Sequence, residues 1–222
     1  VTDKKEEFDF YYKKFHFESI YENLSGTKIL ELGCSTGLST KFLSDMNLDV
    51  TVLEGSELNI KNSKKNFKFN ENIKFIEILW EDFKTDEKFS DILLVDSLQL
   101  LTNKNILLEK YKKMMDEDAV FHIISPNSNS LHRQVGKEMG IINSLTDQSE
   151  MDKLVSSHQN LNWENARELF IDLNFEIVKE IPILLKPLDN KSMLKLDEDQ
   201  ITSFFNIAKD YKSRCSHMYF AL

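Results

Sequence analysis

Cysteine, proline and glycine are all scarce in this chain of 222 residues, which has two cysteines, three prolines and six glycines. The two cysteines, Cys34 and Cys215, do not make a disulfide framework, and a reducing compartment is the simpler interpretation. Long apolar runs are missing and the N-terminal residues are charged, so the sequence predicts neither a membrane-spanning helix nor a signal peptide. We therefore expect a soluble, cytoplasmic protein with no membrane partner.

Basic residues are fewer than acidic ones. The chain has 28 lysines and arginines and 37 aspartates and glutamates, which gives a net charge of −9. An extended surface that follows nucleic-acid phosphates depends on lysine and arginine, so a nucleic-acid partner is not expected. The histidines and acids do not fall into a metal-ligand spacing, and no metal site is predicted. Internal repeats and low-complexity linkers are missing too, which with this length predicts one domain over residues 1–222.

What the chain does have is a glycine turn within residues 28–39, which read Lys-Ile-Leu-Glu-Leu-Gly-Cys-Ser-Thr-Gly-Leu-Ser. The apolar residues before the turn predict a short buried strand, and a helical segment follows it. Gly33 and Gly37 permit the backbone angles of a tight turn and the close approach of a ligand. A helix N-terminus at such a turn favours polar or anionic ligand groups.

A second strand ends in an acid at the spacing that a nucleoside site requires. Residues 49–54 are rich in β-forming residues and end in Glu54, about 20 residues after the turn. One carboxylate there can accept hydrogen bonds from both hydroxyls of a ribose. A dinucleotide oxidoreductase would need Gly-x-Gly-x-x-Gly, and Leu38 stands where its third glycine belongs.

The motif at residues 31–37, Glu-Leu-Gly-Cys-Ser-Thr-Gly, together with Glu-Gly-Ser at residues 54–56, resembles the S-adenosylmethionine site of the class I, Rossmann-like methyltransferases. The family pattern is an acid followed by Gly-x-Gly-x-Gly, and here Ser35 replaces the middle glycine. The resemblance implies S-adenosylmethionine as cofactor and S-adenosylhomocysteine as product. It assigns cofactor contacts to Glu31, Gly33, Cys34, Ser35, Gly37, Glu54, Gly55, Ser56, Glu81, Asp82, Asp96 and Ser97.

The fold implied by this resemblance is α/β, with a Rossmann-like, seven-stranded and mostly parallel sheet, helices on both faces, an antiparallel last strand and a helical insertion after strand five. The periodicity of the chain is compatible with it. Further strands are expected over residues 73–78, 91–96, 119–124, 176–183 and 217–222, and helices over 4–24, 57–68, 103–115, 163–173 and 197–211. The acidic residues 116–118 take the place of the usual turn before the fifth strand.

Acids after the third and fourth strands owe their roles to the same resemblance. In these enzymes an acid after strand three accepts a hydrogen bond from the adenine amino group. Asp82 is the better candidate for this role and Glu81 the second. Alternatively, both are solvated acids of a loop. Asp96 and Ser97 follow strand four and are expected beside the reactive methyl group. Many relatives carry a histidine in the next few residues, which is missing from residues 97–101, so no acid–base role is transferred to that position.

Residues 1–25 correspond to a helical cover over the cofactor in the resembled enzymes. Tyr11 and His16 are therefore candidates for substrate contacts. Packing of Tyr11 against the sheet and an exposed position for His16 are the alternatives.

Residues 126–160 form an inserted segment that leaves the sheet at its ligand edge, and we expect it to act as a lid or substrate wall. His132 and His158 are candidate general bases for a hydroxyl acceptor, because histidine titrates near neutrality, although a loop histidine can equally be a surface residue. Asn127 and Arg133 are candidate substrate contacts. Arg133 can bind an acceptor carboxylate or phosphate, or pair with a surface acid.

The insertion also resembles a bacterial branch of these methyltransferases that is often found among genes for surface glycans and secondary metabolites. The resemblance is carried by Pro-Asn-x-x-Ser-Leu-His-Arg at residues 126–133, Met-Gly at 139–140, the region of His158, and Leu-Lys-Pro-Leu at 185–188 with Met193. We expect O-methylation of a small molecule, sugar or glycan precursor, by a protein that is a monomer or homodimer. The alternatives are N- or carboxyl-methylation of a metabolite or peptide, and a cofactor-binding protein without catalysis.

Overall fold

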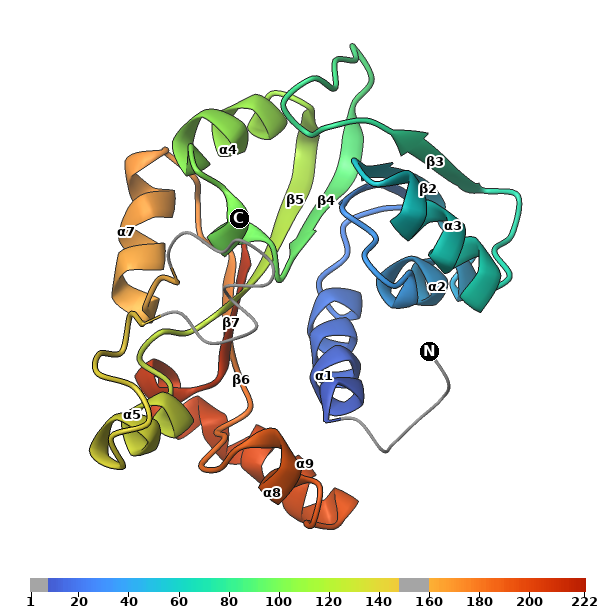
Figure 1. Cartoon of the computed structure of the whole chain (residues 1–222). Helices are drawn as coiled ribbons and strands as arrows, with labels where there is room; N and C mark the ends of the chain where they lie inside the picture. The colour runs from blue at the N-terminus through green and yellow to red at the C-terminus, as the bar shows by residue number, and fades with distance from the viewer. Residues whose placement is uncertain (1–7, 148–159) are drawn as a thin grey trace.

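Seven strands form a single sheet in the order β3-β2-β1-β4-β5-β7-β6 in the computed structural model, which describes residues 8–147 and 160–222 (Figure 1). Strands β1 to β5 run parallel, and β7 runs antiparallel to β5 and β6. This confirms the predicted Rossmann-like sheet. The strands are β1 Lys28–Leu32, β2 Asp49–Glu54, β3 Ile73–Glu77, β4 Phe89–Val95, β5 Met115–Pro126, β6 Lys179–Ile183 and β7 His217–Ala221.

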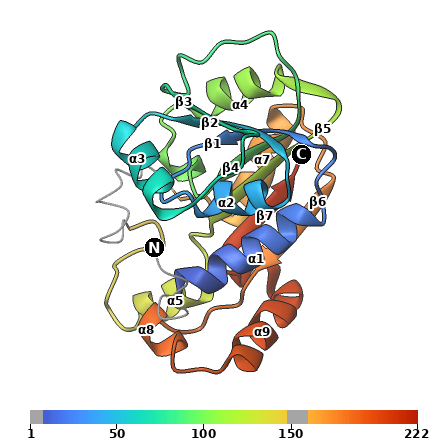
Figure 2. The ribbon, with the colours of Figure 1, turned by 90° about the vertical axis from the view of Figure 1, so that its right-hand side faces the viewer.

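Helices cover both faces of the sheet (Figures 1 and 2). In Figure 1, α1, α2 and α3 lie below β2 and β3 and to the right of β4, whereas α4 and α7 lie to the left of β5. The α-helices are α1 Asp9–Tyr21, α2 Leu38–Asp45, α3 Glu57–Asn66, α4 Lys104–Lys112, α5 Leu131–Glu138, α7 Trp163–Asp172, α8 Asn190–Met193 and α9 Glu198–Ile207, and 3₁₀ helices span Leu98–Leu100 and Ala208–Arg214.

Two apolar cores hold these layers together. On one face the sheet packs against α4 and α7 through residues such as Leu108 and Phe170, and on the other against α1, α2 and α9 through residues such as Phe15 and Ile201. The central strand β4 is apolar throughout its middle because both of its faces are covered, as expected for a parallel sheet. The loops that leave the carboxyl ends of β1, β2, β4 and β5 therefore meet at one edge, where open α/β sheets bind their ligands.

The start of β5 differs from the expectation. The sequence predicts a turn at residues 116–118, but β5 already begins at Met115, which pairs with Phe89 across an irregularity in the register. The three acids are exposed. Their charges remain in water while the backbone continues the strand, so the turn expected here from the family pattern is wrong.

A buried polar network connects the middle strands on the side of the sheet away from its carboxyl edge. Asp91 accepts hydrogen bonds from the N–H groups of Ser25 at 2.8 Å and Gly26 at 2.9 Å. Its Oδ1 also lies 2.8 Å from His122 Nε2, and His122 Nδ1 lies 2.9 Å from the Tyr219 hydroxyl. This network joins β4, β5 and β7 to the segment that precedes β1.

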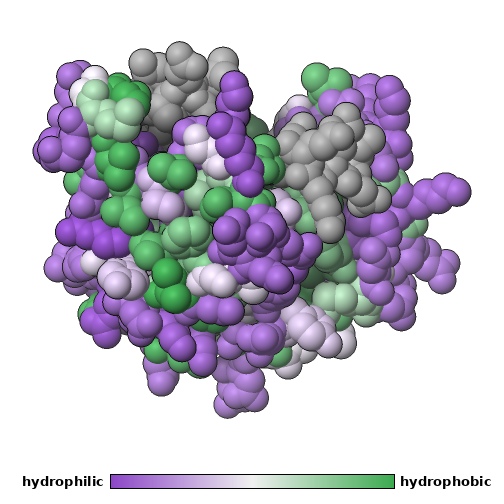
Figure 3. Space-filling model, turned by 90° about the horizontal axis from the view of Figure 1, so that it is seen from below, coloured by the Kyte–Doolittle hydropathy of each residue, from purple (hydrophilic) through white to green (hydrophobic). Residues whose placement is uncertain are grey.

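The carboxyl edge of the sheet faces downward in Figure 1, toward α5, α8 and α9. Figure 3 shows the molecule from this side, where apolar residues run between hydrophilic ones across the surface. Helix α5 directly follows β5, which confirms a helical insertion at that place. In the described parts of the chain, no helix combines the length and apolar character needed to cross a membrane.

Candidate active site

The glycine turn between β1 and α2 has left-handed backbone angles, with φ of +87° at Gly33, +47° at Ser35 and +87° at Gly37. A Cβ on Gly33 would lie 2.9 Å from the Trp80 ring, and one on Gly37 would lie 2.7 Å from the Cβ of Ser63. Both glycines are therefore required for the shape and the packing of the turn. Ser35 takes up a conformation that costs a non-glycine residue about 1–2 kcal/mol.

Glu54, the last residue of β2, binds the backbone of this turn. Its Oε2 accepts hydrogen bonds from the N–H groups of Cys34 at 3.2 Å and Ser35 at 3.3 Å, and its Oε1 accepts one from the N–H of Ser56 at 3.0 Å. Sequence reasoning missed this role. A ribose diol, the ligand implied by the resemblance, would share the lone pairs of Glu54 with these N–H groups.

Glu31, in β1, is a buried acid with one unused oxygen. The Thr40 hydroxyl donates to its Oε2 at 2.7 Å, whereas Oε1 is inaccessible and has no hydrogen-bond partner in the described part of the chain. Burial raises the pKa of Glu31 to about 8, although the Thr40 hydrogen bond opposes this. An ammonium group of a ligand placed against Oε1 would satisfy it and stabilise the carboxylate form.

The loop after β3 presents Glu81 and Asp82 to solvent. Its backbone is anchored by Lys110, whose Nζ donates to the carbonyls of Trp80 at 2.9 Å and Glu81 at 2.7 Å. The half-buried Trp80 ring lies against Gly33 and so forms part of the wall of the site. Sequence analysis named the acids and missed this tryptophan, although an aromatic residue beside them was a usable signal.

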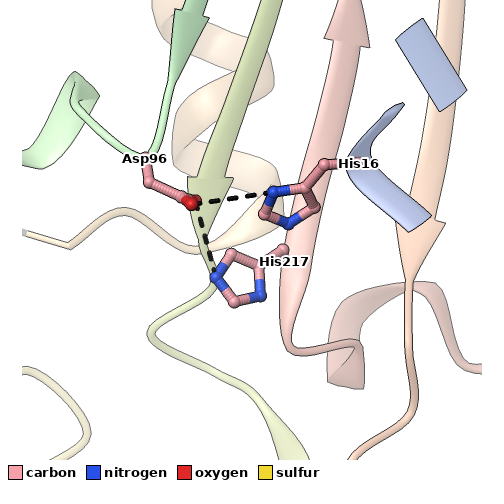
Figure 4. A group of neighbouring side chains, drawn as sticks. All are labelled: His16, Asp96 and His217. Carbon is pink, nitrogen blue, oxygen red and sulfur yellow. Dashed lines mark ion pairs between the residues drawn. The ribbon is translucent and has the colours of Figure 1, made fainter. Parts of the chain in front are cut away.

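Asp96, directly after β4, lies at the centre of a group of basic side chains. Lys13 Nζ donates to its Oδ2 at 2.7 Å. His16 Nδ1 lies 3.6 Å from Oδ2 and His217 Nε2 lies 3.6 Å from Oδ1, and both rings point toward the carboxylate, from α1 and β7 respectively (Figure 4). The neighbouring Ser97 hydroxyl turns back and donates to a carbonyl of β4 at 3.0 Å.

The charges of this group follow from its burial. Burial alone would raise the pKa of Asp96, but the charge of Lys13, together with His16 and His217, lowers it far below its usual value. Burial lowers the pKa of His16 well below its usual value and that of His217 to about 4. At neutral pH the group therefore contains one carboxylate, one ammonium and two neutral imidazoles.

Sequence analysis found only part of this group. It left His16 open between a substrate contact and an exposed position, and the exposed alternative is wrong, because His16 is fully buried. It did not single out Lys13 or His217. The only signal for His217 was its position at the start of the last strand, which pairs with the carboxyl end of β5.

His132, on α5, lies near the same group. Burial, with the positive charges of Lys186 and Arg133 among the further causes, lowers the pKa of His132 to about 3. Lys186 is itself buried, donates to the side-chain oxygen of Asn190, and has its pKa lowered by burial to about 8. Sequence analysis noted Lys186 only as part of a resemblance and missed it as a site residue.

Asn127 and Arg133, two predicted substrate contacts, bind the protein's own backbone. The Asn127 amide donates to the carbonyls of Ser213 at 3.1 Å and Cys215 at 2.9 Å. Arg133 Nε donates to the carbonyl of Leu145 at 2.9 Å, and its guanidinium also binds the carbonyl of Asp147. These contacts hold the chain around the edge of the sheet in place.

Tyr11 and His158 complete the predicted set. Tyr11 is buried, with its ring centroid 5.9 Å from that of Phe8 and 5.6 Å from that of Phe10. Tyr11 also belongs to the apolar core that includes the strand residues Val52 and Leu93, which supports packing against the sheet. His158 lies outside the described residues.

A family model described as a methyltransferase domain matches residues 23–197. No curated protein matches the chain. Among solved structures, an S-adenosylmethionine dependent methyltransferase from Mesorhizobium loti has a TM-score of 0.67 at 12% identity, with 93% of this chain and 96% of that chain covered.

Two further solved structures show the same fold. An S-adenosylmethionine dependent methyltransferase from Archaeoglobus fulgidus has a TM-score of 0.63 at 14% identity, covering 98% of this chain and 94% of that one. The plantazolicin methyltransferase BamL, in complex with a triazolic desmethylPZN analog and SAH, has a TM-score of 0.58 at 15% identity, covering 94% of this chain and 80% of that one.

Proposed function

The chain belongs to the methyltransferase-domain family and is an S-adenosylmethionine-dependent methyltransferase, and from this premise we propose that it methylates an oxygen of a small molecule, sugar or glycan precursor. The observation that carries the choice of oxygen is the group around Asp96, where His16 and His217 place neutral imidazoles beside a carboxylate. Such groups are suitable partners for a hydroxyl. Family membership favours this enzyme over a cofactor-binding protein without catalysis.

The residues around the glycine turn fit the cofactor. The unused oxygen of Glu31 suits the ammonium of its methionine part, Glu54 suits the ribose, and Asp82 or Glu81 suits the adenine amino group. When bound, the cofactor supplies an electrophilic methyl group on a sulfonium. We propose the remaining contacts, largely through backbone and small side chains, for Gly33, Cys34, Ser35, Gly37, Gly55, Ser56, Asp96 and Ser97.

Positioning is the main catalytic contribution of the protein, because in-line methyl transfer needs little beyond correct geometry. A hydroxyl acceptor also benefits from a base that takes up its proton. We retain His132 as the proposed base because its buried Nδ1 has no hydrogen-bond partner in the described part of the chain. His158 remains a second candidate from the sequence.

Lys186 is the best candidate for binding a negative group of the acceptor. It is buried and forms no ion pair with any described residue, and its ammonium lies over the rings of Phe8 at 5.6 Å and Tyr12 at 5.7 Å. A carboxylate or phosphate would supply the missing counter-charge. Arg133, with its donors on carbonyls, is proposed instead to shape the insertion, and Asn127 likewise.

We propose that residues 1–25 and 126–160 cover the site as parts of one domain, and that the protein acts in the cytoplasm as a monomer or homodimer without a nucleic-acid partner. The net charge of −9 supports the last point. The position of α1 supports the first, because α1 brings Lys13 and His16 to the carboxyl edge of β4.

Transfer of a radiolabelled methyl group from S-adenosylmethionine to a panel of sugars, nucleotide sugars and hydroxylated metabolites tests this function. We expect label in an alkali-stable product, and we expect Lys186→Met to raise the KM for acidic acceptors more than it lowers kcat. A product that releases its label in alkali would be a methyl ester and would favour carboxyl methylation. Label in an amine or peptide would favour the alternative that the likeness to the plantazolicin methyltransferases suggests.

A further inference from the structure

Three side chains from distant parts of the chain converge at the carboxyl edge of β4. Donor atoms of His16, Asp96 and His217, one from each, all lie within 4.8 Å of one another (Figure 4). We propose that these residues bind a first-row divalent metal ion beside the methyl acceptor. Two imidazoles and one carboxylate are a recurrent ligand set for such ions, and they leave further coordination positions open.

The hydrogen bonds of His217 show which of its nitrogens is free. The Ser216 hydroxyl has one hydrogen, which it donates to the carbonyl of Ile183 at 3.0 Å. Nδ1 of His217, 3.3 Å from the same hydroxyl, must then be the donor, as assigned from this network. Nε2 therefore carries a lone pair and faces Oδ1 of Asp96.

Two electron-rich atoms thus face each other at 3.6 Å, a distance too long for a hydrogen bond. Oδ1 of Asp96 is inaccessible and has no hydrogen-bond partner among the described residues. Such an arrangement is unfavourable unless a cation or a proton donor lies between the two atoms. The bond from His217 to Ser216 is also the kind of outer contact that orients metal-binding histidines.

His16 gives the second, independent observation. It is fully buried, and neither of its ring nitrogens has a hydrogen-bond partner in the part of the chain that the structure describes. An imidazole left unsatisfied in this way costs free energy that a ligand at Nδ1 would recover in part. Metal–ligand distances near 2.1 Å separate neighbouring donor atoms by about 3–3.5 Å. The two 3.6 Å separations involve different oxygens of Asp96, and the three donor atoms lie within 4.8 Å of one another, so the side chains must move closer together when an ion binds.

Lys13 opposes the ion. Its ammonium binds Oδ2 of Asp96 at 2.7 Å, and like charges repel. The site is therefore expected to bind metal with moderate affinity and to tighten when Lys13 is neutralised. If the proposed function is correct, a bound ion would also hold the acceptor oxygen and lower the pKa of its hydroxyl; this consequence rests on that function, whereas the binding of the ion does not.

Cobalt(II) is a suitable probe because its visible absorption reports nitrogen coordination. We expect chelator-treated wild type to bind about one equivalent with a d–d absorption band, and His16→Gln and His217→Gln to lose the band while remaining folded by circular dichroism. Glu87→Gln, at an exposed acid outside the group, is the control and should bind as wild type does. Lys13→Met should bind cobalt about tenfold or more tightly.

Each outcome bears on the site itself. Absence of a cobalt band in both wild type and Lys13→Met would overturn the proposal, even if the histidine variants failed to fold. A band that persists in His16→Gln and His217→Gln would place the ion elsewhere and overturn it as well. Calorimetric binding of S-adenosylmethionine and methyl transfer by the chelated enzyme are measured separately, so a failed metal site and a failed methyltransferase assignment give different results.

Discussion

Two aspartate–histidine groups lie near opposite ends of β4, and they differ in how completely their atoms are bonded. Asp91 receives hydrogen bonds from Ser25, Gly26 and Ser90 and lies 2.8 Å from His122. Among the described residues, the Asp96 side chain accepts a hydrogen bond from Lys13 alone, and the nearest ring nitrogens of His16 and His217 lie 3.6 Å from its oxygens. The polar atoms of the first group are hydrogen-bonded without a ligand. In the second group, Asp96 Oδ1 and both ring nitrogens of His16 have no partner among the described residues.

This difference separates a structural role from a binding role. A fully bonded buried network stabilises the fold, and removing one member leaves the others without partners. A buried group with unused donors and acceptors lowers stability, and a ligand, ion or water that binds to it can account for its presence. The fold thus uses the same residue types to fasten one end of the sheet and to form a site at the other.

The largest expected effect is on stability at Asp91. We expect Asp91→Ala to lower the free energy of unfolding by about 3–5 kcal/mol, because it strands His122 and two backbone N–H groups in the interior. Asp96→Ala should change it by less than about 1 kcal/mol, since Lys13 can reach solvent. Urea unfolding of both variants measures the contrast. Equal losses would remove the distinction between the two groups.

Acid should also lower the stability of the protein through the Asp91 network, as Asp91→Ala does. Burial alone would raise the pKa of Asp91, but hydrogen bonds from His122 and the Ser25 N–H lower it below its usual value. The folded state thus favours the ionised form, so this stability is present above about pH 4 and is lost as the pH falls through the folded pKa. Unfolding of wild type should therefore depend more steeply on pH below 4 than that of Asp91→Ala. Parallel pH profiles would contradict the account.

Glu31 extends the comparison to a second unsatisfied acid. Burial raises the pKa of the Glu31 carboxyl in the folded protein to about 8. The unfolded chain releases the carboxyl proton at a lower pH, near the usual value for glutamate. The cofactor-free protein therefore loses stability as the pH rises from about 4 to 8. We expect Glu31→Gln to raise the free energy of unfolding by about 1–3 kcal/mol at pH 8. We also expect this variant to bind S-adenosylmethionine more weakly. Thermal unfolding and calorimetry measure the two effects. A variant that loses stability at pH 8 would show that Glu31 is structural.

The smallest effect is expected at Ser216, which fixes the ring of His217. Ser216→Ala should weaken cobalt binding by about tenfold, the usual consequence of losing an outer hydrogen bond at a metal site. Cobalt titration with the circular dichroism spectrum as a control measures this. An unchanged affinity would mean that the hydroxyl does not select the nitrogen of His217 that faces Asp96.

Local patterns in the sequence were enough for the order of the elements and for expecting the glycine turn and Glu54 at the same edge of the sheet. The glycine turn and Glu54 belong to consecutive strands, and the spacing between them follows from one strand–helix–strand unit. The position of β5 was less accessible, because acids 116–118 have turn-like composition but lie exposed along a strand.

The second half of the site could not be found in this way. His16, Asp96 and His217 meet only because the sheet brings β4 beside β5 and β5 beside β7, with α1 packed across them. The periodicity of the sequence does not indicate contacts between residues so far apart in the chain. The burial of Lys186 and the position of Trp80 on Gly33 also depend on tertiary packing.

Calorimetric titration of S-adenosylmethionine and S-adenosylhomocysteine into wild type, Glu54→Ala and the exposed control Glu87→Ala tests the central assignment most directly. We expect wild type and Glu87→Ala to bind both ligands, and Glu54→Ala to lose most of the affinity because the glycine turn and the ribose lose the same carboxylate. Failure of folded wild type to bind either ligand would contradict the assignment of this turn as the cofactor site.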